Sequence, residues 1–154
     1  MDKRNIKIIA SILAIVLVVV AFVAVFVKLD KLETTETIGV GIFENGDIYM
    51  DGDKAGMEKK SDTALRTEDY ITADGLTVEL DEEAEIVYSI VFYDKDKTFI
   101  SAVTDQAVDF DGTIPENAEF AKVVIHHATD AEYEFNLFNR RGFAKQLTIT
   151  VNKD

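Results

Sequence analysis

The residues of this 154-residue chain that are best suited to ligand binding are a few tyrosines and arginines. Sugar-binding sites stack aromatic rings on the apolar faces of sugars and hold the hydroxyl groups with polar side chains. Tyr49 and Tyr133 fall in segments where we expect exposed rings, whereas Tyr88 and Tyr93 fall in an apolar segment and are expected in the core. The chain has no tryptophan, so any sugar stacking would depend on tyrosine.

Three arginines could hold a polar ligand. Arg66 lies in a strongly acidic chain, so an internal ion pair or a loop cap is its expected role, with ligand contact as the alternative. Arg140 and Arg141 lie in a predicted turn and form a basic spot that is either solvated or in contact with a partner. The predicted ligand-binding residues are therefore Tyr49, Arg66, Tyr133, Arg140 and Arg141.

The acidic turns raise the question of a metal. Calcium needs six to eight oxygen ligands, and none of the aspartate clusters follows the EF-hand pattern. We expect no cofactor, and an extracellular calcium ion near Asp94 and Asp96 is the open alternative. His126 and His127 are adjacent, and adjacent residues on a strand point to opposite faces, so they are not expected to bind one metal together.

Nothing in the sequence points to catalysis. The chain has no cysteine, which excludes cysteine nucleophiles, and Ser61, Ser89 and Ser101 lie outside any Gly-x-Ser-x-Gly motif. The acidic residues are so numerous that a pair of carboxylates suited to glycoside hydrolysis carries no information. We therefore predict a non-enzymatic protein, with hydrolysis as the weaker alternative.

The elements that would position these residues are β-strands. Asn45-Gly46 is a typical hairpin turn and is expected to join Ile38–Phe43 to Ile48–Met50. The further expected strands are Leu76–Leu80, Glu85–Tyr93, Thr98–Val103, Glu119–His126, Glu132–Phe138 and Leu147–Val151. No segment after residue 37 shows a helical period, so the expected fold is all-β, an antiparallel β-sandwich of the jelly-roll type.

An apolar run precedes this β region. Ile8–Val27 contains twenty residues without a charge, and twenty helical residues span roughly 30 Å, the thickness of a bilayer core. We predict a transmembrane helix over residues 8–28, since a cleaved signal peptide would have a shorter apolar core and a small-residue cleavage site. Lys3, Arg4 and Lys7 place residues 1–7 in the cytoplasm. Residues 29–37 would form a linker, and residues 38–154 an extracytoplasmic domain.

The net charge excludes some partners. The chain carries a formal charge of −13, and without Asp2, Lys3, Arg4 and Lys7 the remainder carries 13 basic and 28 acidic residues, a net charge of −15. Nucleic acids are bound through clustered lysine and arginine, so we expect no nucleic-acid partner. The same charge argues against a domain that lies flat on anionic lipid.

Three segments resemble parts of a known family of β-sandwich modules. They are LRTEDYI (Leu65–Ile71), VYSIVFYDKDKTFIS (Val87–Ser101) and IPENAEFAKVVI (Ile114–Ile125). In this order they are similar to the carbohydrate-binding-module and galactose-binding-like jelly rolls of bacterial surface and phage tail proteins. Such modules often carry arginine in the strand where this chain has Lys122. The resemblance covers about Ile38 to Ile125 and implies a jelly-roll fold with a glycan-binding role.

The sequence thus predicts a single-pass membrane protein that displays a non-enzymatic module outside the cytoplasm. Its partners would be the bilayer, through the N-terminal helix, and a wall or external glycan. The alternative is a structural or assembly subunit of a surface complex, with a protein partner or further copies of the chain bound to the β domain. An exposed groove with tyrosine and polar side chains would favour the first role, and an exposed apolar patch the second.

Overall fold

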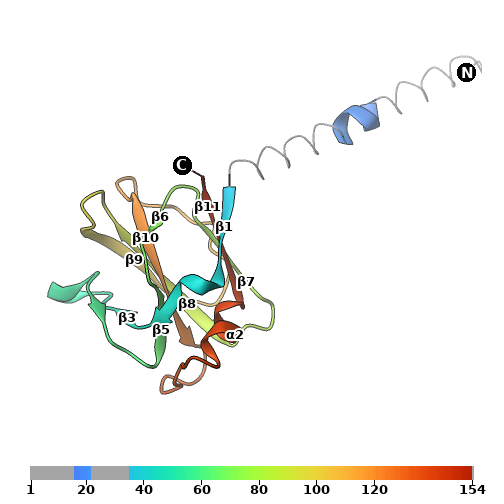
Figure 1. Ribbon diagram of the computed structural model, residues 1–154. Coiled ribbons are helices and arrows are strands. Elements are labelled where there is room, and N and C mark those ends of the chain that lie inside the picture. Colours follow the sequence, from blue (N-terminus) through green and yellow to red (C-terminus); the bar gives the residue numbers. More distant parts are fainter. Residues whose placement is uncertain (1–15, 22–34, 154) are drawn as a thin grey trace, which may run out of the picture. The chain divides into compact units, whose positions relative to one another are not determined.

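The computed structural model describes residues 16–21 and 35–153, shown in colour in Figure 1. Residues 16–21 are helical, and the rest of the predicted transmembrane helix, residues 8–28, lies outside the described residues. Within the two described ranges, no helix has both the length and the apolar character needed to cross a membrane. The β domain is a compact unit over residues 36–154.

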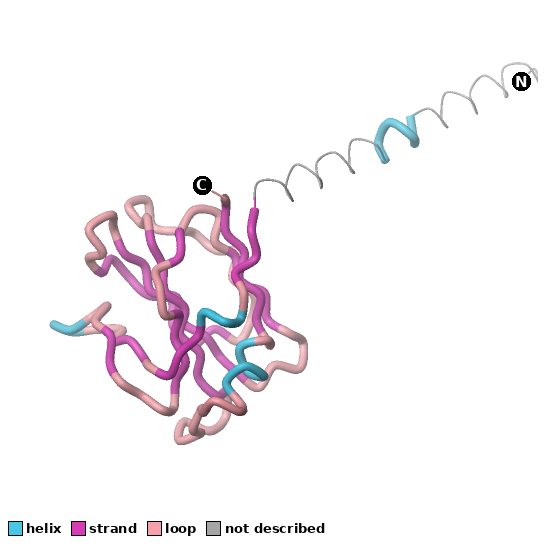
Figure 2. Tube along the Cα trace, in the orientation of Figure 1, coloured by secondary structure: helices cyan, strands magenta, loops and turns pink. Residues whose placement is uncertain are grey.

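The β domain consists mainly of strands (Figure 2). Its strands are β1 (Thr35–Ile38), β2 (Phe43–Asn45), β3 (Asp47–Ile48), β4 (Glu58–Lys59), β5 (Ala64–Thr67), β6 (Ile71–Thr72), β7 (Thr77–Leu80), β8 (Ile86–Tyr93), β9 (Phe99–Gln106), β10 (Phe120–His127) and β11 (Leu147–Asn152). Two 3₁₀ turns, η1 (Val40–Ile42) and η2 (Gly52–Lys54), and one short helix, α2 (Arg140–Ala144), complete it. The first strand begins at Thr35, inside the segment predicted as a linker.

Nine of the described strands form a sandwich of two sheets, as predicted, and β3 and β4 form a separate two-stranded sheet. One sheet has the order β1-β11-β7, and the larger one has the order β2-β5-β10-β8-β9, with β6 also paired to β10. The main hydrophobic core lies between them, because it combines residues of β7 and β11 with residues of β5, β8 and β10. Every register that the structure gives between two strands is antiparallel.

The centre of the larger sheet confirms the prediction from hydrophobic patterning. β8 and β10 pair over their full length, with Ile125 opposite Tyr88 and Phe120 opposite Tyr93. The β8 side chains are buried on both faces of the sheet, apart from the half-buried Val87. Such two-sided burial is what a strand with apolar residues at consecutive positions requires. Tyr88 and Tyr93 belong to the core, as expected.

The outer face of the larger sheet carries a second, smaller core. Ala64, Val91, Tyr93 and Val124 lie on this face and pack with Ile48 of β3. The two-stranded β3–β4 sheet therefore covers part of the larger sheet on the side that faces away from β11. This outer layer positions most of the polar side chains described below.

The predicted hairpin at Asn45-Gly46 is wrong. β2 and β3 do not pair with each other. β2 pairs with β5, through Glu44 opposite Arg66, and β3 pairs with β4, through Asp47 opposite Lys59. The chain passes through Gly46 without reversing. The reversal comes after β3, where the Tyr49 N–H donates to the Met57 carbonyl and the Gly56 N–H donates to the Tyr49 carbonyl. The prediction fails because this extended segment changes its partner strand at Gly46, from β5 to β4. A two-residue turn motif carries no information about such a change.

The strand predicted over Glu132–Phe138 is also wrong. The segment is irregular between two turns, although Phe135 is buried and its N–H donates to the carbonyl of Asp62. The turn predicted at Arg140 and Arg141 is replaced by the α2 helix, which buries Phe143 and Ala144. The alternating aromatic residues here belong to a local cluster, in which Tyr133, Phe135 and Phe143 meet edge-on with ring centroids 5.1 to 5.5 Å apart.

Candidate functional site

The main candidate site is a groove on the outer face of the larger sheet, which we call the β3 groove. It has a volume of about 410 Å³. Its lining residues come from β3 and the loop after it, β4, β8, β9 and β10, and they are Asp47, Ile48, Tyr49, Met50, Asp51, Lys59, Ser89, Thr104, Asp105 and His126. The groove thus combines one aromatic ring with several hydrogen-bonding side chains, and its size falls within the range of small-molecule sites.

A β-bulge shapes one wall of the groove. Tyr88 pairs with Gln106 and Ile90 with Val103, so Ser89 faces two residues of β9, Thr104 and Asp105. Asp105 has a positive φ of 51°, and its N–H donates to the Ser89 hydroxyl oxygen at 3.1 Å. The bulge therefore holds two additional polar side chains at the edge of the groove.

Asp47 is the electrostatic centre of the groove. Its carboxylate lies 2.8 Å from the Lys59 ammonium and 3.5 Å from Nε2 of His126, and it accepts the Ile48 N–H at 2.7 Å. Burial favours the neutral acid, but hydrogen bonds from His126, Lys59 and Ile48 outweigh it and lower the pKa of Asp47 to about 2. Asp47 is therefore an anion under ordinary conditions, and it holds Lys59 and His126 in place.

Tyr49 is the predicted stacking residue that lies in this groove. Its ring is half-buried, and the ammonium groups of Lys54 and Lys59 lie 5.4 and 5.1 Å from the ring centroid. Ammonium groups at this distance are attracted to the π-system of the ring. Lys54 of η2 and Lys59 of β4 therefore both lie beside the Tyr49 ring at the edge of the groove.

Arg66, another predicted binding residue, lies in an ion-pair network beneath β4. Its guanidinium contacts Glu44 at 2.6 Å and Glu58 at 2.5 Å, and its side chain is largely buried. Glu58 also accepts a hydrogen bond from the buried Lys122 at 2.5 Å. Burial opposes ionisation of Glu58, but its contacts with Lys122 and Arg66 lower the pKa of its carboxyl group. Arg66 thus has the internal ion pairs that the sequence led us to expect.

Tyr133, Arg140 and Arg141 lie elsewhere in the fold. Tyr133 stacks on His127 with ring centroids 4.6 Å apart and meets Phe143 edge-on at 5.1 Å. Arg140 and Arg141 belong to α2 and line a separate hollow of about 330 Å³ with Val40, Gly41, Phe43 and Leu137. The five predicted residues are therefore not one site, because only Tyr49 lines the β3 groove.

The acidic turn at Asp94 and Asp96 is closed by its own hydrogen bonds. Oδ1 of Asp94 accepts the N–H groups of Asp96 and Thr98, at 2.9 and 2.8 Å. Lys95 lies 3.5 Å from the Asp96 carboxylate. Over residues 16–21 and 35–153, no group of three or more histidine, cysteine or acidic side chains is arranged to hold a metal ion.

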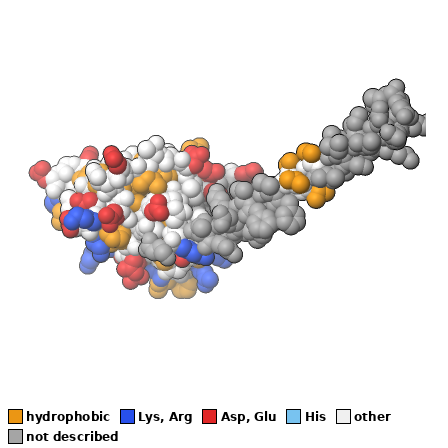
Figure 3. Space-filling view, turned by 90° about the horizontal axis from the view of Figure 1, so that it is seen from above, with side chains coloured by type: hydrophobic (Ala, Val, Ile, Leu, Met, Phe, Trp, Pro, Cys, Tyr) orange, Lys and Arg blue, Asp and Glu red, His pale blue; other side chains and the backbone are white. Residues whose placement is uncertain are grey.

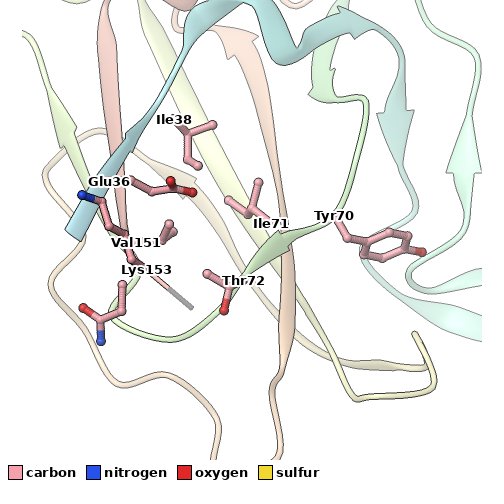
Figure 4. A pocket seen from close by; sticks show the side chains of 8 residues that line it. Glu36, Ile38, Tyr70, Ile71, Thr72, Val151 and Lys153 are labelled. Atoms are coloured by element: carbon pink, nitrogen blue, oxygen red, sulfur yellow. The ribbon is translucent and has the colours of Figure 1, made fainter. Parts of the chain in front are cut away.

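A further cavity, of about 480 Å³, lies where β1, β6 and β11 come together. Figure 4 shows Ile38, Ile71 and Val151 around this space, whereas the Tyr70 ring lies apart from them. Tyr70 packs against Tyr93 with ring centroids 5.0 Å apart. The cavity has fewer hydrogen-bonding side chains than the β3 groove and is the weaker candidate for a polar ligand.

Comparisons with known proteins identify no relative. No protein-family model matches the chain, and neither the curated proteins nor the solved structures gave a significant match. We therefore infer the function from the geometry of this chain.

The sequence predicted no binding role for Asp47, Lys59 or Lys122, although Lys122 occupies a position where the resembled modules often carry arginine. Lys122 had one detectable signal, a lysine in the middle of an otherwise apolar strand. Asp47 and Lys59 lie 12 positions apart and meet only because β3 pairs with β4, so their contact had no local signal.

Proposed function

We propose that this chain is a membrane-anchored, extracytoplasmic module that binds a wall or external glycan without catalysis, and that the β3 groove is the binding site. The observation that carries the proposal is the position of Tyr49 beside the polar side chains of the groove. The ring offers an apolar stacking surface, and the charged and hydroxyl groups offer hydrogen bonds to sugar hydroxyls.

The arrangement of charge supports a neutral or mildly polar ligand. Asp47 is paired with the Lys59 ammonium, so its charge is largely compensated inside the groove, and Nε2 of His126 lies 3.5 Å from it. Asp51 and Asp105 remain as carboxylate acceptors, and Thr104 adds a hydroxyl. A carboxylate accepts hydrogen bonds from two vicinal hydroxyls, a pattern that suits a polyhydroxylated ring better than an apolar or anionic ligand.

The experiment starts from the full-length protein in detergent, tested on a broad glycan array and on purified bacterial peptidoglycan sacculi. We expect binding to at least one of these probes. Tyr49→Ala should weaken that binding at least tenfold, because it removes the stacking surface. Thr104→Ala should weaken it severalfold through the loss of one hydrogen bond.

The matched control is Thr148→Ala. Thr148 is exposed on β11, in the other sheet, so the substitution removes the same atoms away from the groove. It should leave glycan affinity unchanged. A flat result on the array and on sacculi would overturn the glycan role and favour the assembly role.

An assembly subunit that contacts protein is the second candidate function. The hollow near α2 and the exposed side chains beside it favour this role. They lie in a different part of the fold from the β3 groove, so the two roles can be tested separately.

A further inference from the structure

The loop before α2 exposes two large apolar side chains. Phe138 is 97% and Leu137 is 74% exposed. In Figure 1 this loop lies at the end of the sandwich opposite to the C-terminal end of β11. Exposed apolar residues of this size, next to each other at the end of a domain, are typical of an interaction surface.

This loop holds its apolar residues in an ordered turn. The Asn136 N–H donates to Oδ1 of Asn139 at 2.7 Å, and Oδ1 of Asn136 accepts the N–H groups of Phe138 and Asn139 at 2.9 and 3.2 Å. The Asn139 amide also donates to the Glu134 carbonyl at 3.0 Å. Because the turn is already ordered, docking of Phe138 would cost little conformational entropy.

A hollow lies beside the exposed pair. Its volume is about 330 Å³, larger than a phenyl ring, and its lining includes Val40, Phe43 and Leu137 together with both arginines of α2. An apolar knob and a hollow with both apolar and arginine side chains thus share one surface. A surface with both features is complementary to itself, as a two-fold symmetric contact requires.

The charges around the knob are also self-complementary. Glu132 and Glu134 are exposed on one side of the turn in sequence, and Arg140 and Arg141 follow it. Within the described part of the chain, none of these four side chains forms an ion pair with another residue. The segment is therefore balanced in charge although the β domain is strongly acidic, so two copies could approach here with less repulsion than elsewhere.

We propose that two copies of the chain dimerise through this surface, which we call the tip surface: Glu132, Glu134, Leu137, Phe138, Arg140 and Arg141. Phe138 of each copy occupies the hollow of the other, and the arginines of each copy pair with the glutamates of the other. Phe138 is the central anchor, and the charged pairs set the register and exclude other partners. The inference does not depend on the glycan role of the β3 groove.

The first experiment measures self-association of the full-length protein in a mild detergent by sedimentation velocity over a range of protein concentrations. We expect a monomer–dimer equilibrium. Phe138→Ser should weaken it at least tenfold, and Val108→Ser, which changes an exposed apolar residue outside the tip surface, should leave it unchanged. Because both variants keep the N-terminal apolar segment, association through that segment would persist in both.

The second experiment reverses charges. The variant R140E/R141E has only acidic groups at the tip surface, and the variant E132K/E134K has only basic ones. Each should lose self-association at least tenfold, whereas an equimolar mixture of the two should form a heterodimer. A merely structural role of these residues would not restore association in the mixture.

Three results would overturn the proposal. The first is a wild-type protein that stays monomeric at all concentrations, and the second is association that Phe138→Ser does not weaken. The third is binding of the tip surface to phosphatidylglycerol vesicles or to an unrelated acidic protein with no self-association. If the protein forms the dimer but binds no glycan, the proposed glycan role of the β3 groove is contradicted and the dimer proposal for the tip surface stands.

Discussion

Nζ of Lys122 lies 2.5 Å from Oε1 of Glu58, and this contact joins the centre of the larger sheet to the β3–β4 layer that covers it. Lys122 is 1% exposed, and its ammonium also donates to the backbone carbonyls of Glu68, at 2.8 Å, and Thr67, at 3.3 Å. Its charge is thus satisfied on three sides. A buried ammonium without such partners would be strongly destabilising.

Glu58→Gln should destabilise the β domain by about 1–3 kcal/mol, because it leaves the Lys122 charge buried without its carboxylate. Chemical denaturation of the full-length protein measures this loss. Glu83→Gln, at an exposed position, is the control for the loss of one negative charge. Equal stability of the two variants would show that the Lys122–Glu58 pair contributes nothing.

The stability of the domain should fall on acidification through Asp47. Its pKa is about 2 in the folded state against 3.8 for the unperturbed group, so the unfolded state binds more protons between these values. The stabilisation is present above about pH 4 and is lost as the pH falls towards 2, and it amounts to about 2 kcal/mol. Unfolding free energies measured from pH 5 to 2 should show this slope.

Asp47→Asn should lose the part of this slope that comes from Asp47, whereas the part that comes from the lowered pKa of Glu58 remains. Asp51→Asn removes a carboxylate from an exposed position in the next loop and controls for charge alone. If the acid dependence of Asp47→Asn equals that of the wild type, the Asp47–Lys59–His126 contacts are not its source.

Tyr88 should titrate well above an ordinary tyrosine. Burial raises the pKa of Tyr88 to about 12, and the nearby Asp109 carboxylate adds to the effect. The phenol donates to the Val108 carbonyl at 2.7 Å, which also favours the protonated form. Because the folded pKa is above the unfolded value of 10.0, this contribution to stability is complete below pH 10 and is lost as the pH rises towards 12.

Near-ultraviolet absorbance from pH 9 to 13 measures this titration. Tyr88→Phe should remove one phenolate step near pH 12 and leave the steps at lower pH unchanged. Loss of a step near pH 10 in this variant would instead place Tyr88 in a solvated position.

Gly56 should not tolerate a side chain. Its φ is +79°, which disfavours other residues, and a Cβ there would lie 2.6 Å from Cβ of Phe99. Its carbonyl also accepts the Tyr93 hydroxyl at 2.8 Å, which fixes the position of the backbone. Gly56→Ala should destabilise the domain by about 2–4 kcal/mol, the sum of backbone strain and overpacking.

Gly142→Ala is the matched control for Gly56→Ala. Gly142 lies in α2, and a Cβ there would meet no atom within 4 Å. Because alanine favours helix, this variant should be neutral or more stable by up to about 1 kcal/mol in thermal or chemical unfolding. Destabilisation by both variants to the same extent would contradict the steric argument.

The fold prediction was correct for the strands whose hydrophobic pattern matches the burial of their own side chains. The residues of β8 and β10 are apolar at consecutive positions, and Leu147, Ile149 and Val151 of β11 alternate with polar residues. Each pattern follows from the environment of its own strand, so it can be identified without knowing the partner strand. The sandwich of antiparallel sheets could be inferred from these segments.

The prediction failed where a residue depends on a distant partner. Asn45-Gly46 has the local chemistry of a turn, but β2 and β3 continue through it because β5 and β4 are available to pair. Tyr133 and Phe135 alternate as in a strand, yet they pack with Phe143 of α2 in an aromatic cluster. In both places long-range pairing overrides a local preference.

The amino-acid sequence by itself determined the class of fold, the net charge, the apolar N-terminal run and the core position of Tyr88 and Tyr93. These depend on the composition and on short-range periodicity. The tertiary structure alone decided that Asp47, Lys59 and His126 meet beside Tyr49, that Glu58 reaches the buried Lys122, and that Phe138 is exposed beside a hollow. The physical reason is that these contacts join residues far apart in the chain, and only the pairing of the strands brings them within a few ångströms of each other.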